Sequence, residues 1–123
     1  AKRALPLPVS VPSHCSLMKP AAEKLAEALQ SVKINRPKIR VIHNADVASY
    51  DDAEKIKDAL VRQLYSPVRW TETVNALVSD GLTESAECGP GKVLAGLAKR
   101  INKEAVCTAL TNIEQVTAFV ETH

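Results

Sequence analysis

The chain has few aromatic residues, few glycines and no long hydrophobic run. Only four of its 123 residues are aromatic and only four are glycine. Its 16 Lys and Arg nearly balance 14 Asp and Glu, so the formal net charge is +2. This composition argues against a nucleic-acid-binding protein. No apolar stretch approaches the ~20 residues that span a bilayer, and no signal-peptide pattern is present, so we expect a cytoplasmic protein with no membrane partner.

Cysteine is scarce as well, with three residues at positions 15, 88 and 107. An odd number at these spacings fits neither a disulfide framework nor a metal site, and we expect small buried side chains in a reducing compartment. A hydrolase using Cys15 as its nucleophile is the least favoured function, because adjacent residues such as His14 and Cys15 rarely point at one another. His43 and His123 lack ligand partners at suitable spacing, so no metal is expected.

The remaining composition is that of a folded domain, with 46% hydrophobic and 24% charged residues. Hydrophobic periodicity predicts alternating strands and helices, and therefore an α/β fold with a mostly parallel sheet flanked by helices. The expected strands cover residues 4–11, 38–42, 82–88 and 105–109. The expected helices begin near Ser13 to Ser16, at Asp51 or Asp52, at Ser66-Pro67, after Gly89-Pro90-Gly91 and at Thr111.

Local signals refine the ends of these helices. Gly81 is predicted to end the third helix, and Thr111 with Glu114 is predicted to form a capping box for the last one. The inward residues of that last helix would be Val116, Phe119 and Val120. The segment 89–92 resembles a phosphate-binding loop, but Val93 replaces the required Ser or Thr and the earlier glycine is missing. We therefore expect a tight strand-to-helix turn there.

Two polar residues are candidates for chemistry. His14 follows a proline-rich segment and precedes a predicted helix, whose positive dipole end favours the neutral ring that a general base needs. From position alone, a surface or capping histidine is the favoured interpretation, and a general base is the alternative. Gln63 lies on the apolar face formed by Ile56, Ala59, Leu60 and Leu64. It is either a satisfied buried amide or a residue at the edge of a pocket.

Four segments together resemble a known family. They are ALPLPVSVPSHCSLM (residues 4–18), ALVRQLY (59–65), PVRWT (67–71) and GPGKVL (89–94). In this order they are similar to the C-terminal part of the bacterial malonyl-CoA:acyl carrier protein transacylases, over nearly the whole chain. The tail beyond Asn102 is the least distinctive part of the match.

The resemblance implies an activity. The family transfers a malonyl group from malonyl-CoA to the phosphopantetheine thiol of acyl carrier protein in fatty-acid biosynthesis, through a malonyl-serine intermediate. It implies that His14 is the catalytic histidine, oriented by main-chain carbonyl groups, and that Gln63 supplies this carbonyl region and borders the pocket. Lys2, Arg3, Lys99 and Arg100 would contribute to docking of the carrier. Malonyl-CoA would be a substrate, and no cofactor is implied.

The resemblance also predicts what lies outside the sequence. Residues 1–123 would form the C-terminal portion of the large subdomain, an α/β-hydrolase-like core. The nucleophilic serine and an inserted ferredoxin-like subdomain would belong to a missing N-terminal half. This fits a chain that begins at Ala1 rather than at methionine, as a fragment or a processed protein does. We expect the isolated chain to be inactive. The alternative is a non-catalytic α/β module that binds acyl carrier protein.

Overall fold

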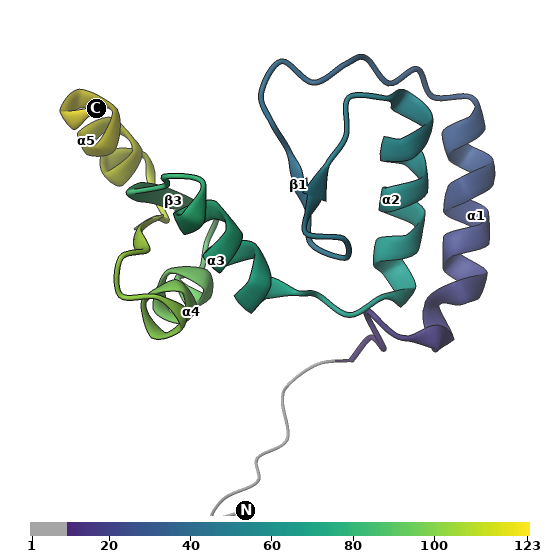
Figure 1. Cartoon of the computed structure of the whole chain (residues 1–123), viewed down its shortest axis with the longest axis horizontal. Helices are drawn as coiled ribbons and strands as arrows, with labels where there is room; N and C mark the ends of the chain where they lie inside the picture. Colours follow the sequence, from purple (N-terminus) through teal and green to yellow (C-terminus); the bar gives the residue numbers. More distant parts are fainter. Residues whose placement is uncertain (1–9) are drawn as a thin grey trace, which may run out of the picture. The chain divides into compact units, whose positions relative to one another are not determined.

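The computed structural model describes residues 10–123, which form two compact units. Among the described residues, the first unit covers residues 10–69 and the second Trp70–His123, and each is described by itself (Figure 1). The strand expected over residues 4–11 lies almost entirely outside the described residues, and Ser10 and Val11 are not in a strand. No helix in residues 10–123 is long and apolar enough to cross a membrane.

The first unit is built on two helices that lie side by side (Figure 1). A short 3-10 helix, η1 (Ser16–Met18), leads into α1 (Lys19–Gln30), and α2 (Ala53–Tyr65) packs against it. Pro20 lies in the first turn of α1, where the missing N–H has no intrahelical partner to lose. Asp52 caps α2, since its side chain accepts a hydrogen bond from the Lys55 N–H. The start of α2 agrees with the sequence-based prediction, whereas α1 begins at Lys19, after the short η1, rather than near Ser13 to Ser16.

A small hairpin completes the first unit. Strand β1 (Ile42–His43) pairs with β2 (Ala48–Ser49) antiparallel, through the turn at residues 44–47. The prediction of a strand over residues 38–42 is therefore wrong except at its last residue. Ile39 is 80% exposed, so its apolar side chain does not mark a buried strand.

The second unit contains a parallel strand pair with a helical crossover. Its elements are α3 (Trp70–Ser79), β3 (Glu84–Cys88), α4 (Val93–Ile101), β4 (Val106–Leu110) and α5 (Ile113–Thr122). β3 and β4 pair from Glu84↔Val106 to Cys88↔Leu110. Val74, Ala98 and Ala105 form the buried core, against which Trp70 packs. A mostly parallel sheet is thus confirmed only for this pair, because the described residues form two separate two-stranded sheets.

Helix α3 begins and ends at defined positions. It begins at Trp70, later than the predicted start at Ser66-Pro67, and residues 67–69 are not helical. At its other end Gly81 has φ +95°, and the N–H of Leu82 bonds back to the carbonyl of Leu77. This left-handed glycine confirms the predicted helix end.

Helix α5 differs from its prediction at the cap and on its inner face. Asn112, rather than Thr111, caps the helix by accepting from the Gln115 N–H at 2.9 Å, and Gln115 reaches back to the Thr111 N–H. The capping pair is therefore one residue further along than the Thr111 and Glu114 pair. Val116 and Val120 are exposed and Phe119 is only half-buried, so the predicted inward face is wrong within this chain.

Candidate functional site

His14 lies between the proline-rich segment and η1, with an unusual backbone conformation. Its φ is +63°, in the left-handed region that residues with a Cβ rarely adopt. Such a conformation persists only where the surroundings hold it, and it is typical of functional positions. The holding contact is a hydrogen bond from the His14 N–H to the carbonyl of Leu64, 3.0 Å away.

The imidazole ring of His14 binds the neighbouring carbonyl of the same helix end. Nδ1 lies 3.0 Å from the main-chain oxygen of Gln63. Because a carbonyl oxygen only accepts hydrogen bonds, Nδ1 must carry the proton in this contact. In the neutral ring Nε2 is then left as an acceptor. This is the protonation pattern that a general base needs.

This contact changes the electrostatic argument made from the sequence. α1 begins only at Lys19, and the His14 ring bonds instead to the last turn of α2. Carbonyls in a last turn lack intrahelical partners, so the two groups of His14 satisfy two of them. The partners of the His14 ring and N–H are thus carbonyls at the negative end of α2, while the effect of the helix that follows His14 stays a prediction.

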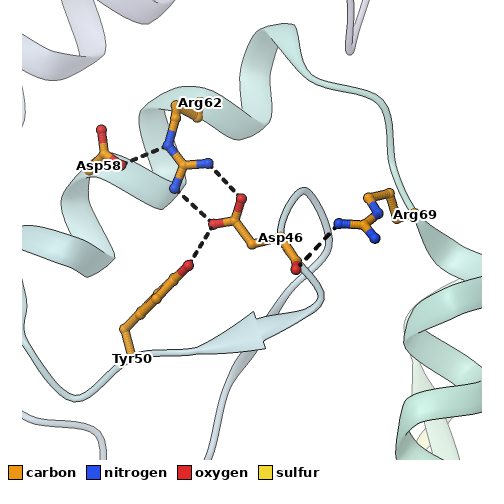
Figure 2. Close-up of polar contacts among 5 residues, drawn as sticks. All are labelled: Asp46, Tyr50, Asp58, Arg62 and Arg69. Carbon is orange, nitrogen blue, oxygen red and sulfur yellow. Dashed lines mark hydrogen bonds and ion pairs between the residues drawn. The ribbon is translucent and has the colours of Figure 1, made fainter.

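Beside this helix end, a cluster of charged residues joins the hairpin turn to α2 (Figure 2). The guanidinium of Arg62 grips the Asp46 carboxylate with two hydrogen bonds, of 2.5 Å and 2.8 Å. Its Nε donates to Asp58 at 2.7 Å, and the Tyr50 hydroxyl donates to Asp46 at 3.1 Å. Arg69 reaches the main-chain oxygen of Asp46 at 3.5 Å.

These charges stabilise one another. The hydrogen bonds from Arg62 hold the pKa of the Asp46 carboxyl below its usual range, and the Tyr50 hydroxyl adds to this effect. Asp46 and then Asp58 raise the pKa of Arg62 in turn. A two-pronged pair of this kind fixes orientation as well as charge, because both arms must align at once. The cluster therefore ties the turn firmly to α2.

The other residues of the predicted site are placed less specifically. Gln63 is partly buried. This burial does not decide between the two interpretations left open from the sequence, a buried amide and a residue at the edge of a pocket. Lys99 and Arg100 are exposed in the last turn of α4, in the second unit. Lys2 and Arg3 lie outside the described residues. Their roles, like those of His14 and Gln63, stay predictions.

The cysteines are not uniformly buried. Cys15 is partly exposed and its thiol donates to the carbonyl of Pro12 at 3.2 Å. Cys107 packs against the core of the second unit, but Cys88, at the end of β3, is exposed. The prediction of a buried side chain is therefore wrong for Cys88. Within residues 10–123 there is no group of three or more His, Cys, Asp and Glu that could hold a metal ion.

The glycine-rich segment after β3 is a turn, as predicted. Gly89 has φ +149°, which favours a residue without Cβ. The carboxylate of Glu87 accepts a hydrogen bond of 2.8 Å from the Ala95 N–H, in the first turn of α4. This carboxylate satisfies one of the N–H groups at the start of α4, which are otherwise available to an anion.

Sequence reasoning missed the charged cluster. Arg62 directly precedes Gln63 within the ALVRQLY segment, and Asp46 lies in the turn at 44–47. A signal was nevertheless present, because Asp58 and Arg62 are spaced i,i+4 on one helix. Asp46, the other partner of Arg62, is 16 positions away in the sequence, so no local spacing pattern indicates this pair.

Known proteins resemble this chain closely over part of their length. No family model matches it. A malonyl CoA-acyl carrier protein transacylase from Haemophilus influenzae is 54% identical over 121 residues, which are 98% of this chain and 39% of the relative. The chain thus spans about two fifths of the length of the curated relatives it matches.

Solved structures give the same result. An acyl carrier protein S-malonyltransferase from Vibrio cholerae has a TM-score of 0.89 and 56% identity, over 96% of this chain and 39% of that one. A malonyl-transacylase solved in complex with a type II PKS acyl-carrier protein has a TM-score of 0.93 and 49% identity, over 99% of this chain and 40% of that one. The chain is therefore a homologue of the malonyl CoA-acyl carrier protein transacylases and corresponds to the C-terminal portion of their sequence.

Proposed function

We propose that this chain supplies the general base, and part of the carrier-docking surface, of an enzyme that transfers malonyl from malonyl-CoA to acyl carrier protein. The observation that carries the proposal is the bond between His14 Nδ1 and the main-chain oxygen of Gln63. It leaves Nε2 free to accept a proton, in a segment that matches the transacylases along nearly its whole length.

The proposed chemistry passes a proton through the His14 ring twice, once in each half of the exchange. His14 Nε2 accepts the proton of a serine hydroxyl as the serine oxygen attacks the malonyl thioester, and the ring returns that proton to the departing CoA thiolate. The ring then accepts the proton of the phosphopantetheine thiol, which attacks the malonyl-serine ester and releases the serine, to which the proton passes. No redox change occurs in either half, and the proposed reactants are malonyl-CoA and the phosphopantetheine thiol, with no cofactor.

The serine must come from sequence outside residues 1–123. None of the four glycines stands in a G-x-S-x-G elbow, the turn that exposes such a nucleophile. We therefore propose that residues 1–123 form the C-terminal portion of an α/β-hydrolase-like core, completed by an N-terminal half carrying the serine. The parallel pair β3 and β4 with its α4 crossover supports this view. The natural setting of a CoA-dependent transfer of this kind is the cytoplasm.

A chimera tests this proposal. The matching 39% of the Haemophilus influenzae relative is replaced by this chain, and malonyl transfer to phosphopantetheinylated acyl carrier protein is followed by mass spectrometry. We expect transfer at a rate near that of the unmodified relative, and none from the 123-residue chain alone. A folded chimera that binds the carrier but transfers no malonyl would contradict the proposal and favour the non-catalytic carrier-binding module.

Docking of the carrier is proposed for the basic end of α4. Lys99 and Arg100 are exposed there and would attract an acidic carrier. The relative solved with an acyl-carrier protein supports a carrier as the partner. Reversing both residues to Glu in the chimera should raise KM for the carrier and leave KM for malonyl-CoA unchanged. Equal carrier KM in the reversed and unmodified chimeras would remove the docking assignment.

A further inference from the structure

The position of the His14 ring depends on the last turn of α2. Both hydrogen bonds of His14 in this region end on carbonyls of that turn, Gln63 and Leu64. The residue that follows the helix, Ser66, is already extended, with φ −107°. Residues 62–65 are helical, so the direction of these two carbonyls follows the backbone of the last turn. Contacts from outside α2 that hold this turn in place therefore also hold the two carbonyls.

The hairpin turn supplies those contacts on both sides of the helix end. Before Gln63 in the chain, Arg62 is held through its side chain by the Asp46 carboxylate. After it, the N–H of Arg69 donates to the carbonyl of Asn44 at 3.0 Å, and the Arg69 guanidinium reaches the Asp46 carbonyl. Figure 2 shows Arg62 and Arg69 both reaching Asp46. The turn thus holds the chain on either side of the two carbonyls that bind His14.

The turn itself is well anchored. The N–H groups of Asp46 and Val47 both bond to the carbonyl of His43, and Val47 has φ +55°. The ring of Tyr50 lies 5.6 Å from that of the buried His43, while its hydroxyl bonds to Asp46. Because the turn is fixed at both strands, the Asp46 carboxylate holds the Arg62 side chain in a defined position.

Burial separates this ion pair from an ordinary surface pair. The Asp46 and Arg62 side chains are 16% and 32% exposed, whereas those of the Arg36 and Asp51 pair are 76% and 68% exposed. Exposed pairs contribute little because water screens them and both side chains move freely. A partly shielded, two-pronged pair holds its geometry better.

We propose that Asp46 and Arg62 are positioning residues, which orient His14 for catalysis by fixing the Gln63 carbonyl at the end of α2. This inference rests on the proposed function, since it gives the charged cluster a role in the same proton transfer. Neither residue touches the reacting atoms. Their effect passes through the main chain from Arg62 to Gln63, and from there to His14 Nδ1.

The first test reads the ring directly and needs no activity. The chimera is labelled with ¹⁵N-histidine, and the signals of His14 are identified by their absence from the His14→Gln variant. In the unmodified chimera we expect the proton on Nδ1. In Asp46→Asn, which is nearly isosteric, we expect the Nδ1 and Nε2 shifts to converge as the two tautomers exchange. Asp51→Asn is the matched control, and should leave the His14 signals in place.

The second test reads the consequence for catalysis. Asp46→Asn should lower kcat by about 10- to 100-fold, the loss that a small misplacement of a catalytic group causes, with KM for malonyl-CoA within about twofold. Asp51→Asn should change neither constant. A loss of protein stability alone would reduce the amount of active enzyme, but would not change the tautomer of the folded fraction.

The outcomes are distinguishable. Unchanged His14 signals and unchanged kcat in folded Asp46→Asn would overturn the positioning role while leaving the proposed function intact. Converging signals in a chimera that transfers no malonyl even when unmodified would overturn the function alone. If Asp46→Asn does not fold, Arg62→Lys decides the matter, because it keeps the charge and removes the two-pronged grip. A protonated Nδ1 and normal kcat in Arg62→Lys would contradict the proposal.

Discussion

His14 combines a left-handed backbone with two bonds to one helix end. His14 has a positive φ. The Leu64 carbonyl binds its N–H, and the Gln63 carbonyl binds its ring. A carbonyl partner fixes which nitrogen carries the proton. It offers a developing imidazolium less charge than the carboxylate of a Ser-His-Asp triad would. In the proposed reaction, that arrangement suits exchange between two thioesters of similar energy, which runs in both directions.

The partner of His14 is the main chain of Gln63, so the side chain of Gln63 is less important than its backbone. Gln63→Ala keeps the carbonyl and retains good helix propensity. We therefore expect it to lower malonyl transfer in the chimera by less than about tenfold, against the ~10²–10⁴-fold contribution of a general base. A loss as large as that of removing the histidine would show that the amide, rather than the carbonyl, does the work.

At this scale the sequence identifies some of the site and conceals the rest. Gln63 is conspicuous because an amide interrupts an apolar helical face, and His14 because it follows a proline-rich segment and precedes a helix. Asp46 looks like any turn residue. Its proposed role comes from its contact with Arg62 on α2. A contact between residues far apart in the chain produces no periodic pattern in a single sequence.

Helices were predicted more accurately than strands at the scale of elements. The helices carry caps, a first-turn proline and a terminal glycine, all of which act locally. The strand expected over residues 38–42 fails because its apolar residues, such as Ile39, are exposed in this chain. β1 is set instead by the turn at 44–47, which pairs it with β2. Tertiary placement outweighed local hydrophobicity there.

The cap of α5 gives a test at the same scale. Asn112→Ala removes the acceptor for the Gln115 N–H and should destabilise the chain by about 1 kcal/mol. Glu114→Ala removes only a first-turn carboxylate and should cost about 0.3 kcal/mol at low salt. Chemical denaturation of both variants measures the difference. Equal losses would favour the Thr111 and Glu114 capping box over the observed cap.

The pH dependence of stability belongs to the whole molecule. His123, after α5, bonds through Nε2 to the Glu84 carboxylate at 2.7 Å and through Nδ1 to the Phe119 carbonyl at 2.8 Å. Its ring also stacks on Phe119, with the centroids 4.2 Å apart. Both nitrogens face acceptors, which suits the protonated ring. The Glu84 carboxylate, with the Phe119 carbonyl, raises the pKa of His123 above its ordinary 6.5.

The sign of the resulting pH dependence follows. A group whose pKa is raised in the folded state stabilises it fully below the unfolded pKa, and this contribution is lost as pH rises through the folded value. We therefore expect the chain to lose stability as pH rises from about 6.5, the unfolded pKa, through the higher pKa of His123 in the folded state. His123→Ala should flatten this part of the pH profile of thermal unfolding. An equally steep fall in the variant would remove His123 as its cause.

The whole molecule contributes only part of an active site by this account. Under the proposed function, residues 1–123 carry the general base and a basic helix end, and the nucleophile lies elsewhere. The isolated chain would then be inactive. Activity should appear only when the sequence is placed in the context of a full-length relative.

The most direct measurement is malonyl transfer by the chimera with His14→Ala. If His14 is the general base, turnover falls by ~10²–10⁴-fold, because proton transfer to and from the serine and thiol loses its catalyst. His123→Ala, a histidine outside the site, serves as the control and should retain normal turnover. A folded His14→Ala chimera that transfers malonyl at the unmodified rate would contradict the account at its centre.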